Sequence, residues 1–212
     1  MSDSFSLAPW PAHVHIEGWP VPASIEDLLD HEFLRSHGAV PHYFGLGFIQ
    51  VKLDAVHRLH AWVPDWPAIP GAETELHDHR YPFTSHVLKG CIEHDVFAIG
   101  PLQDRFEPGL WEVASVSCQP GSSEAPRLLG HAAATLLASV RVGAGQSYAL
   151  TPDAFHRARA HGPIVSLLVR RPTERAEARI LRTPGAPSVC PFSLDVSVEK
   201  CWEGYAQAAQ TL

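Results

Sequence analysis

The sequence contains little lysine and no run of basic residues. Lysine occurs only at positions 52, 89 and 200, the arginines are scattered, and the formal net charge is −7. Such a chain lacks the positive stripe that follows nucleic-acid phosphates, so we expect no nucleic-acid partner. No window approaches the roughly 18 consecutive apolar residues of a membrane span, and residues 1–20 lack a basic start followed by an apolar run. We therefore expect a soluble, cytoplasmic protein without a membrane partner.

Cysteine is also scarce. The chain has Cys91, Cys118, Cys190 and Cys201, and no two of them form a C-x-x-C pair. They are too few and too widely spaced for a disulfide framework. We expect reduced thiols that are mostly buried.

The composition is that of an ordinary folded domain. Of the 212 residues, 45% are hydrophobic and 18% are charged, which excludes disorder as the default state. A chain of this length can bury a sizeable core, and it shows no internal repeat that would divide it. We therefore expect a single domain over residues 1–212.

One helix is expected between Pro22 and Gly38. Ser24, followed three residues later by Asp27, resembles a capping box, and apolar residues follow at helical spacing. Gly38 is a typical stop signal. We interpret this helix as a lid or brace on the N-terminal side.

After residue 40 the pattern changes to short strand-like runs separated by proline and glycine. The runs are 43–53, 57–63, 84–99, 110–117, 131–142, 146–150, 163–171 and 178–183. Strands at this density indicate an all-β sandwich or barrel. A proline-rich connector follows, and we expect a short helix after it, packed on the barrel. The expected organisation is an N-terminal arm and helix over 1–44, a β-barrel core over 45–182 and a C-terminal tail over 183–212.

The segment 75–97 contains the most informative of the 14 histidines. Alternate side chains of a strand share a face, so His77 and His79 should point one way and Asp78 the other. Two imidazoles on one face can converge on a metal ion, which then needs a third ligand from elsewhere. His156, which follows a strand-like run and a proline, is the best candidate.

These histidine segments resemble the two motifs of the cupin family. The layout H-x-H-x3-F-x6-G runs from His77 to Gly90, and residues 145–156 resemble the second motif, in the right order. The resemblance implies a double-stranded β-helix, or jelly roll, with His77, His79 and His156 as metal ligands. It also implies a homodimer, which is common among cupins of this size.

Within cupins the chain is most similar to the cysteine dioxygenase type, in "LHDH", "SYALTPDAFHR" and "VSLLV". Three departures stand beside this resemblance. Phe83 occupies the position where many cupins have a glutamate ligand. Ser166 alone matches the family's serine-histidine-tyrosine relay, because Leu168 and Arg170 stand at its other two positions. The family's substrate-carboxylate arginine has no evident counterpart, so the resemblance supports a metal site better than it supports cysteine as the substrate.

Three neutral imidazoles would leave about two positive charges on a bound divalent ion, which favours anionic, bidentate ligands. Three histidines accept several metals; we expect iron(II), with zinc, nickel and manganese as alternatives. An octahedral iron would keep open positions for a chelating substrate and for dioxygen. Phe83 would make the pocket apolar on the side where many cupins have their glutamate ligand.

Strand alternation also separates inward from outward residues near the first motif. Phe83 and Ser85 should face the barrel interior, and His86 should then point away from it. We interpret His86 as a hydrogen-bonded structural histidine, and His94 on the following strand in the same way.

The remaining candidates have two readings each. Tyr148 either donates a hydrogen bond in the site or packs as a strand tyrosine. Arg157 and Arg170 either hold a substrate carboxylate or lie on the surface at strand ends. The candidate pocket residues are Phe83, Ser85, Tyr148, Arg157, Ser166 and Arg170.

Three function classes remain open. The first is a non-haem iron(II) dioxygenase-like oxidoreductase that acts on a small anionic molecule. The second is an isomerase or lyase in which zinc, manganese or nickel polarises a carbonyl group. The third is a non-catalytic cupin that binds a small ligand. No general base stands out at the inward positions, and the sequence does not separate the first two classes.

Overall fold

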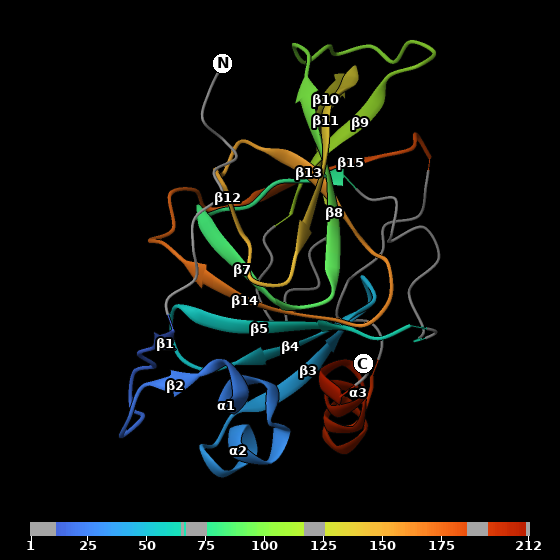
Figure 1. Cartoon of the computed structure of the whole chain (residues 1–212). Coiled ribbons are helices and arrows are strands. Elements are labelled where there is room, and N and C mark those ends of the chain that lie inside the picture. The colour runs from blue at the N-terminus through green and yellow to red at the C-terminus, as the bar shows by residue number, and fades with distance from the viewer. Residues whose placement is uncertain (1–11, 65, 67–75, 117–125, 186–194, 211–212) are drawn as a thin grey trace.

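The computed structural model describes residues 12–64, 66, 76–116, 126–185 and 195–210. Two antiparallel sheets form the body of the protein, with the helices outside one of them (Figure 1). The six-stranded sheet, in the order β12-β7-β14-β5-β4-β3, consists of Ser147–Leu150, Phe83–Lys89, Ile164–Arg170, His57–Trp62, Phe48–Lys52 and Val40–Phe44. The seven-stranded sheet, in the order β10-β9-β15-β6-β13-β8-β11, consists of Arg127–Ala132, Trp111–Val116, Ala178–Arg182, Leu76–His77, Phe155–Ala160, Cys91–Ile99 and Ala134–Gly143. This confirms the expected all-β jelly roll.

The barrel interior is filled by side chains from both sheets. Val87 of β7 and Ile164 of β14 pack in one cluster with Ile92 of β8 and Val142 of β11. Along β7 buried and half-buried residues alternate, as they must when one face of a strand turns inward. The two sheets are therefore joined by an apolar layer that surrounds the inward-facing polar residues.

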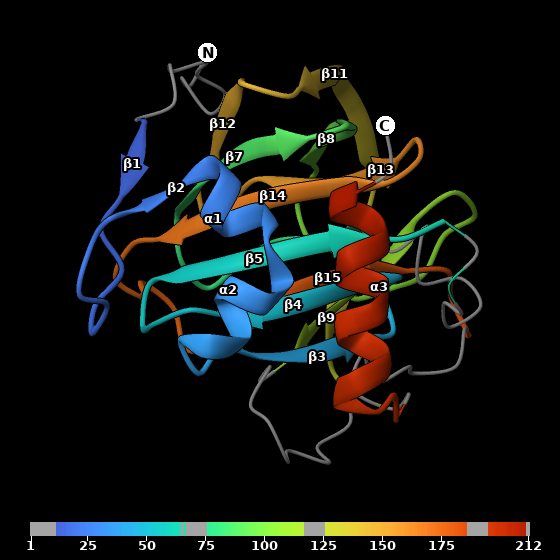
Figure 2. The ribbon, with the colours of Figure 1, turned by 60° about the horizontal axis from the view of Figure 1, so that its bottom comes forward.

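The outer face of the six-stranded sheet carries the largest apolar cluster, and the helices cover it (Figure 2). Leu59 of β5 and Ile49 of β4 are fully buried there against α3, Val198–Gln210. The Tyr205 hydroxyl of α3 donates a hydrogen bond of 2.6 Å to the Leu28 carbonyl oxygen. This sheet thus has an apolar outer face toward the helices and a separate inner face toward the barrel.

The expected N-terminal helix is present but divided into α1, Ile25–Leu29, and α2, His31–Ser36. The capping box is confirmed, because the Asp27 amide donates to Ser24 Oγ and the Ser24 amide donates to the Asp27 carboxylate. The expectation of one continuous helix was wrong at Asp30. Its backbone is extended, and its carboxylate accepts hydrogen bonds from the first amides of α2. An aspartate that caps a new helix in this way competes with continuation of the preceding one.

The N-terminal arm and the C-terminal helix both pack on the same side of the molecule as α1 and α2. Strand β1, His13–Val14, pairs with β2, Ala23–Ser24, and Ile16 between them is buried. Arg35 of α2 forms an ion pair of 2.9 Å with Glu199 of α3. The expected terminal helix is thus confirmed. No helix in the described part of the chain is long and apolar enough to cross a membrane.

Three of the expected strand runs contain more than one strand. Residues 43–53 form the hairpin of β3 and β4, so the sheet begins at Val40, before the expected start of the barrel core. Residues 84–99 are divided between β7 of the six-stranded sheet and β8 of the seven-stranded sheet, and the chain passes from one sheet to the other at Gly90, which has a φ of 81°. Residues 131–142 are divided between β10 and β11. In each case the break between the two strands is too short to show as a change of composition in the sequence.

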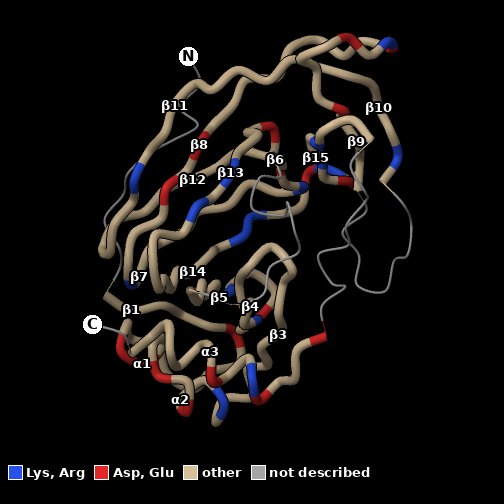
Figure 3. Tube along the Cα trace, turned by 90° about the vertical axis from the view of Figure 1, so that its right-hand side faces the viewer, with Lys and Arg blue, Asp and Glu red and all other residues tan. Residues whose placement is uncertain are grey.

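Charged residues and cysteines are distributed as the composition suggests. Lys and Arg are dispersed over both sheets in the described residues, whereas acidic residues gather on α1 and α2 (Figure 3).

Cys201 is buried and Cys91 is half-buried, both as free thiols. Cys118 and Cys190 lie outside the described residues.

Candidate metal centre

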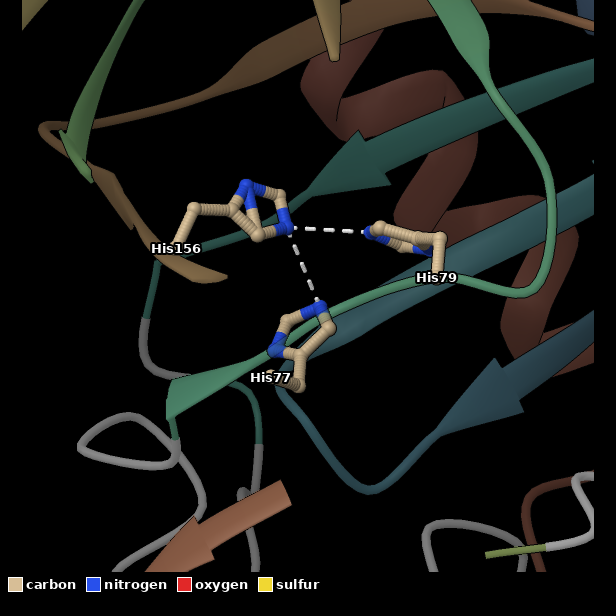
Figure 4. Close-up of side chains that lie close together, drawn as sticks. All are labelled: His77, His79 and His156. Atoms are coloured by element: carbon tan, nitrogen blue, oxygen red, sulfur yellow. Dashed lines mark hydrogen bonds between the residues drawn. The ribbon is translucent and has the colours of Figure 1, made fainter. Parts of the chain in front are cut away.

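Three histidines from two neighbouring strands and the segment after one of them converge on one point (Figure 4). His77 ends β6 and lies opposite His156 of β13 in the strand register, and His79 follows two residues after His77. The Nε2 atoms of His79 and His156 are 3.0 Å apart, and those of His156 and His77 are 3.3 Å apart. The expected convergence of His77, His79 and His156 is therefore present in the structure.

This spacing fits a metal ion better than it fits a set of hydrogen bonds. A ring nitrogen carries either one proton or one lone pair, so His156 Nε2 cannot bond well to two other nitrogens at once. At a metal–nitrogen distance of about 2.1 Å, nitrogens separated by these distances would subtend roughly 90° to 105° at the ion. Such angles suit three ligands on one face of an octahedron or at three corners of a tetrahedron.

The electrostatics of the site favour neutral ligands. Burial lowers the pKa of His79 and of His156 well below the usual value, and the neighbouring histidines lower both further. A lowered pKa means that these two imidazoles are neutral at neutral pH, so each has a lone pair on one of its ring nitrogens. A metal ion would not have to displace protons from these rings.

Asp78 anchors the segment from the opposite side. Its buried carboxylate forms ion pairs with Arg179 at 2.6 Å and with Arg175 at 3.0 Å. The same Arg175 donates a hydrogen bond of 2.6 Å to the His79 carbonyl oxygen. These contacts fix the backbone on either side of the aspartate, which orients the two histidines toward the interior.

Apolar and aromatic groups surround the histidines. Phe83 is buried, and the edge-to-face contact between its ring and that of His79 has a centroid distance of 4.7 Å. Ser85 and Tyr148 are buried and lie opposite each other on β7 and β12. Burial raises the pKa of the Tyr148 hydroxyl, and its hydrogen bond with Ser85 opposes this rise. Phe83 and Ser85 thus lie on the inner side, as strand alternation predicted, and Tyr148 lies there with them.

His86 and Arg157 face away from the site. His86 lies opposite Ser147 in the strand register, and its Nδ1 is 2.5 Å from Ser147 Oγ, which agrees with a structural histidine. Arg157 follows His156 on β13 and therefore points to the opposite face, where it forms an ion pair of 2.6 Å with Asp95. The reading of Arg157 as a carboxylate-binding residue was wrong.

The outward position expected for His94 was also wrong. His94 is 1% exposed and lies opposite Ala158 in the register of β8 and β13, so it shares the inner face with His156. The rings of His94 and His156 are nearly parallel, with centroids 5.4 Å apart, and the Tyr148 ring is 4.1 Å from His94. Burial lowers the pKa of His94 to about 3. Which side chains of β8 face inward depends on its pairing with β13. No local pattern in the sequence reveals this pairing.

Strand β14 carries the other two candidates on its inner face. Ser166 is fully buried, and Leu168 beside it is buried in the interior cluster with Phe83. Arg170 lies opposite Phe83 in the register, and its guanidinium carbon is 3.9 Å from the centroid of the Tyr81 ring. Arg170 therefore belongs to the neighbourhood of the three histidines.

Sequence reasoning missed a polar group on the inner face of β5. Arg58 and His60 lie opposite Leu168 and Ser166 in the register, so they share the inner face with them. Gln50 of β4 is in contact with both, at 3.0 Å from His60 Nε2 and 3.4 Å from Arg58. The alternation of Arg58 and His60 with apolar residues along 57–63 was the available signal.

Arg58 is a half-buried cation with other cations around it. Burial lowers the pKa of Arg58 from its usual value; Tyr81 opposes this, and positively charged Arg170 and Arg80 add to it. The Nε atoms of Arg58 and Arg170 are buried without a hydrogen-bond partner among the described residues. Neither arginine forms an ion pair there. Both side chains are half-buried. A charge partly removed from water without a counter-ion is unfavourable, so a bound anion would stabilise these two arginines.

Comparisons with known proteins give limited likenesses. No protein-family model matches the chain, and no curated protein is similar to it. Among solved structures, Streptomyces albus HEPD with 2-hydroxyethylphosphonate and Fe(II) bound is similar at 12% identity and a TM-score of 0.32, over 60% of this chain and 22% of that one. E. coli ycfD is similar at 13% identity and a TM-score of 0.31, over 61% and 26%. An L-ribose isomerase of Cellulomonas parahominis with L-psicose is similar at 14% identity and a TM-score of 0.27, over 95% and 73%. This chain spans 22% and 26% of the length of the first two proteins. The structure itself shows two antiparallel sheets and a three-histidine cluster.

Proposed function

We propose that this protein is a metal-dependent oxidoreductase of the cupin type, a non-haem iron(II) dioxygenase that acts on a small anionic molecule. The observation that carries the proposal is the convergence of three histidines, with all ligand atoms within 4.8 Å of one another. The set contains no carboxylate, which agrees with Phe83 at the position of the glutamate ligand in many cupins.

The charges around the site support an anionic substrate. Three neutral ligands leave the charge of a divalent ion uncompensated. Arg58 and Arg170 add two positive charges nearby that no carboxylate among the described residues neutralises. A molecule with a metal-binding group at one end and a carboxylate or phosphonate-like group at the other could bind the ion with the first group and the two arginines with the second.

Each group in the site then has a role. His77, His79 and His156 would hold the ion, and Asp78 with its two arginines keeps the first two in place. Iron(II) bound there would supply coordination positions for a chelating substrate and for dioxygen. Apolar side chains at the site, Phe83 and Leu168, exclude water, and the inner arginines orient the anion.

Metal analysis and oxygen uptake test the proposal directly. Protein purified without added metal is analysed for iron, zinc, nickel and manganese, and oxygen consumption is followed on a panel of thiols and β-diketones. Substrate-dependent oxygen uptake by iron-containing protein is the expected result. Turnover without oxygen would instead identify a metal-dependent isomerase or lyase, and tight binding without turnover would identify a ligand-binding cupin.

The proposed anion contact predicts a difference between two arginines. Arg58→Met is expected to raise the KM of the active substrate by about 10- to 100-fold, since a charge-assisted hydrogen bond contributes about 1.5 to 3 kcal/mol. Arg157→Met is the matched control, because Arg157 faces outward and Asp95 keeps Arg159 as a partner. Equal KM values in the Arg58 variant and in the unaltered protein would remove Arg58 from the site.

We also propose that the protein forms a homodimer. Among the described strands, β11 lies at an edge of the seven-stranded sheet, and its Leu136 and Leu137 are 53% and 65% exposed. Exposed apolar side chains on a strand edge favour pairing with another chain. Light scattering of the full-length protein is expected to give twice the chain mass, and Leu137→Lys is expected to lower it. A clean monomer at micromolar concentration would contradict the dimer.

A further inference from the structure

A fourth histidine lies beside the three ligands without belonging to them. The ligand atoms of His77, His79 and His156 form the group within 4.8 Å, and His94 is outside that group. Its ring nevertheless lies parallel to the His156 ring, within 5° and at 5.4 Å between centroids. His94 therefore lies directly beside one of the three candidate ligands, His156.

Both ring nitrogens of His94 are buried and have no hydrogen-bond partner among the described residues. A neutral imidazole carries one N–H donor and one lone pair. Leaving either of them unsatisfied in a protein interior costs about 1 to 3 kcal/mol. The nearest ring, that of Tyr148, is tilted against the imidazole and contacts its ring.

A purely structural role accounts poorly for this arrangement. His86, on the preceding strand β7 of the other sheet, is an example of a structural histidine in this fold, since its Nδ1 is 2.5 Å from Ser147 Oγ. An apolar residue of similar size would fill the place of His94 without an unsatisfied polar atom. The inner face of β8 thus carries a polar group whose partner is missing from the described chain.

We infer that His94 is a positioning residue that hydrogen-bonds the anion coordinated at the three-histidine site. This inference rests on the proposed metal site and names a group that recognises its ligand. The contact selects ligands that carry a second polar atom beside the atom bound to the metal, such as a carboxylate or a hydroxyl next to a donor. Arg58 and Arg170 would contact the far end of such a molecule, and His94 its coordinated end.

Azide binding to cobalt(II)-loaded protein tests the inference, because azide binds a metal through one nitrogen and accepts a hydrogen bond at another. His94→Phe is expected to keep the cobalt content of the unaltered protein and to weaken azide binding about 10-fold, the loss of one hydrogen bond. Azide affinity is followed by the visible absorption of cobalt. His94→Gln, which keeps an N–H donor, is expected to restore most of the affinity, and His86→Phe is the matched control.

Three results would overturn the inference, and they are distinguishable. Unchanged azide affinity in folded, cobalt-loaded His94→Phe would leave His94 without a ligand contact. Loss of cobalt in the His94 variants, with cobalt retained in His86→Phe, would make His94 a part of the ligand set. Absence of cobalt from the unaltered protein would refute the proposed metal site itself. Should the phenylalanine not be accommodated, as judged by circular dichroism, His94→Leu replaces it in the same comparison.

Discussion

His77→Ala, His79→Ala and His156→Ala are each expected to abolish stoichiometric metal binding. The three Nε2 atoms form one cluster, in which His156 Nε2 lies 3.0 Å from His79 Nε2 and 3.3 Å from His77 Nε2. A site with two remaining imidazoles and no carboxylate holds a divalent ion poorly. No other described acidic, cysteine or histidine residue joins the cluster to replace the lost ligand.

Metal content after dialysis, measured by elemental analysis, checks this expectation. His86→Ala serves as the control, because His86 is hydrogen-bonded to Ser147 on the other face of β7 and should keep full metal content. Retention of one ion per chain in any of the three variants would show that the cluster is not the binding site. Equal loss in His86→Ala would point to unfolding instead of ligation.

Cysteine is expected to be a poor substrate, with turnover slower by at least ~10²-fold than that of a substrate matched to the site. The cysteine dioxygenases that the chain resembles use a serine-histidine-tyrosine relay beside the iron. Here Ser166 is followed on the inner face of β14 by Leu168, which is buried among apolar side chains. Leucine neither donates nor accepts a proton. Arg170 stands at the position of the relay tyrosine, and its guanidinium lies over the ring of Tyr81.

The measurement is cysteine-dependent oxygen consumption by iron-loaded protein, with analysis for cysteine sulfinate. A rate in the common enzyme range of ~1 to 10³ per second would show that the relay is dispensable. Activity on another anionic chelator, with little on cysteine, is the expected pattern. It would place the substrate among molecules that fit an apolar wall at Phe83 and a cationic end at Arg58.

The residues predicted correctly are those fixed by local rules. His77 and His79 share a face because a single residue, Asp78, lies between them, and the cap at Ser24 needs only Asp27, three residues later. The second motif placed His156 by its resemblance to a family. These assignments depend on few residues and are unaffected by how distant strands pair.

The residues that were missed depend on long-range pairing. His94 and Arg58 face inward because β8 pairs with β13 and β5 pairs with β14, each in one particular register. A shift of one residue would turn either side chain to the other face. The carboxylate-binding interpretation of Arg157 could have been excluded from the sequence alone. Arg157 directly follows His156, so strand alternation directs it outward.

The two faces of the six-stranded sheet have a practical consequence for the identity of the metal. The largest apolar cluster lies on the outer face, between the sheet and the helices, and contains none of the three histidines. Folding free energy therefore comes mainly from a region that a chelator does not reach. The same folded polypeptide should accept iron, zinc, nickel or manganese in turn, so the metal found in it will report the supply in the cell that made it.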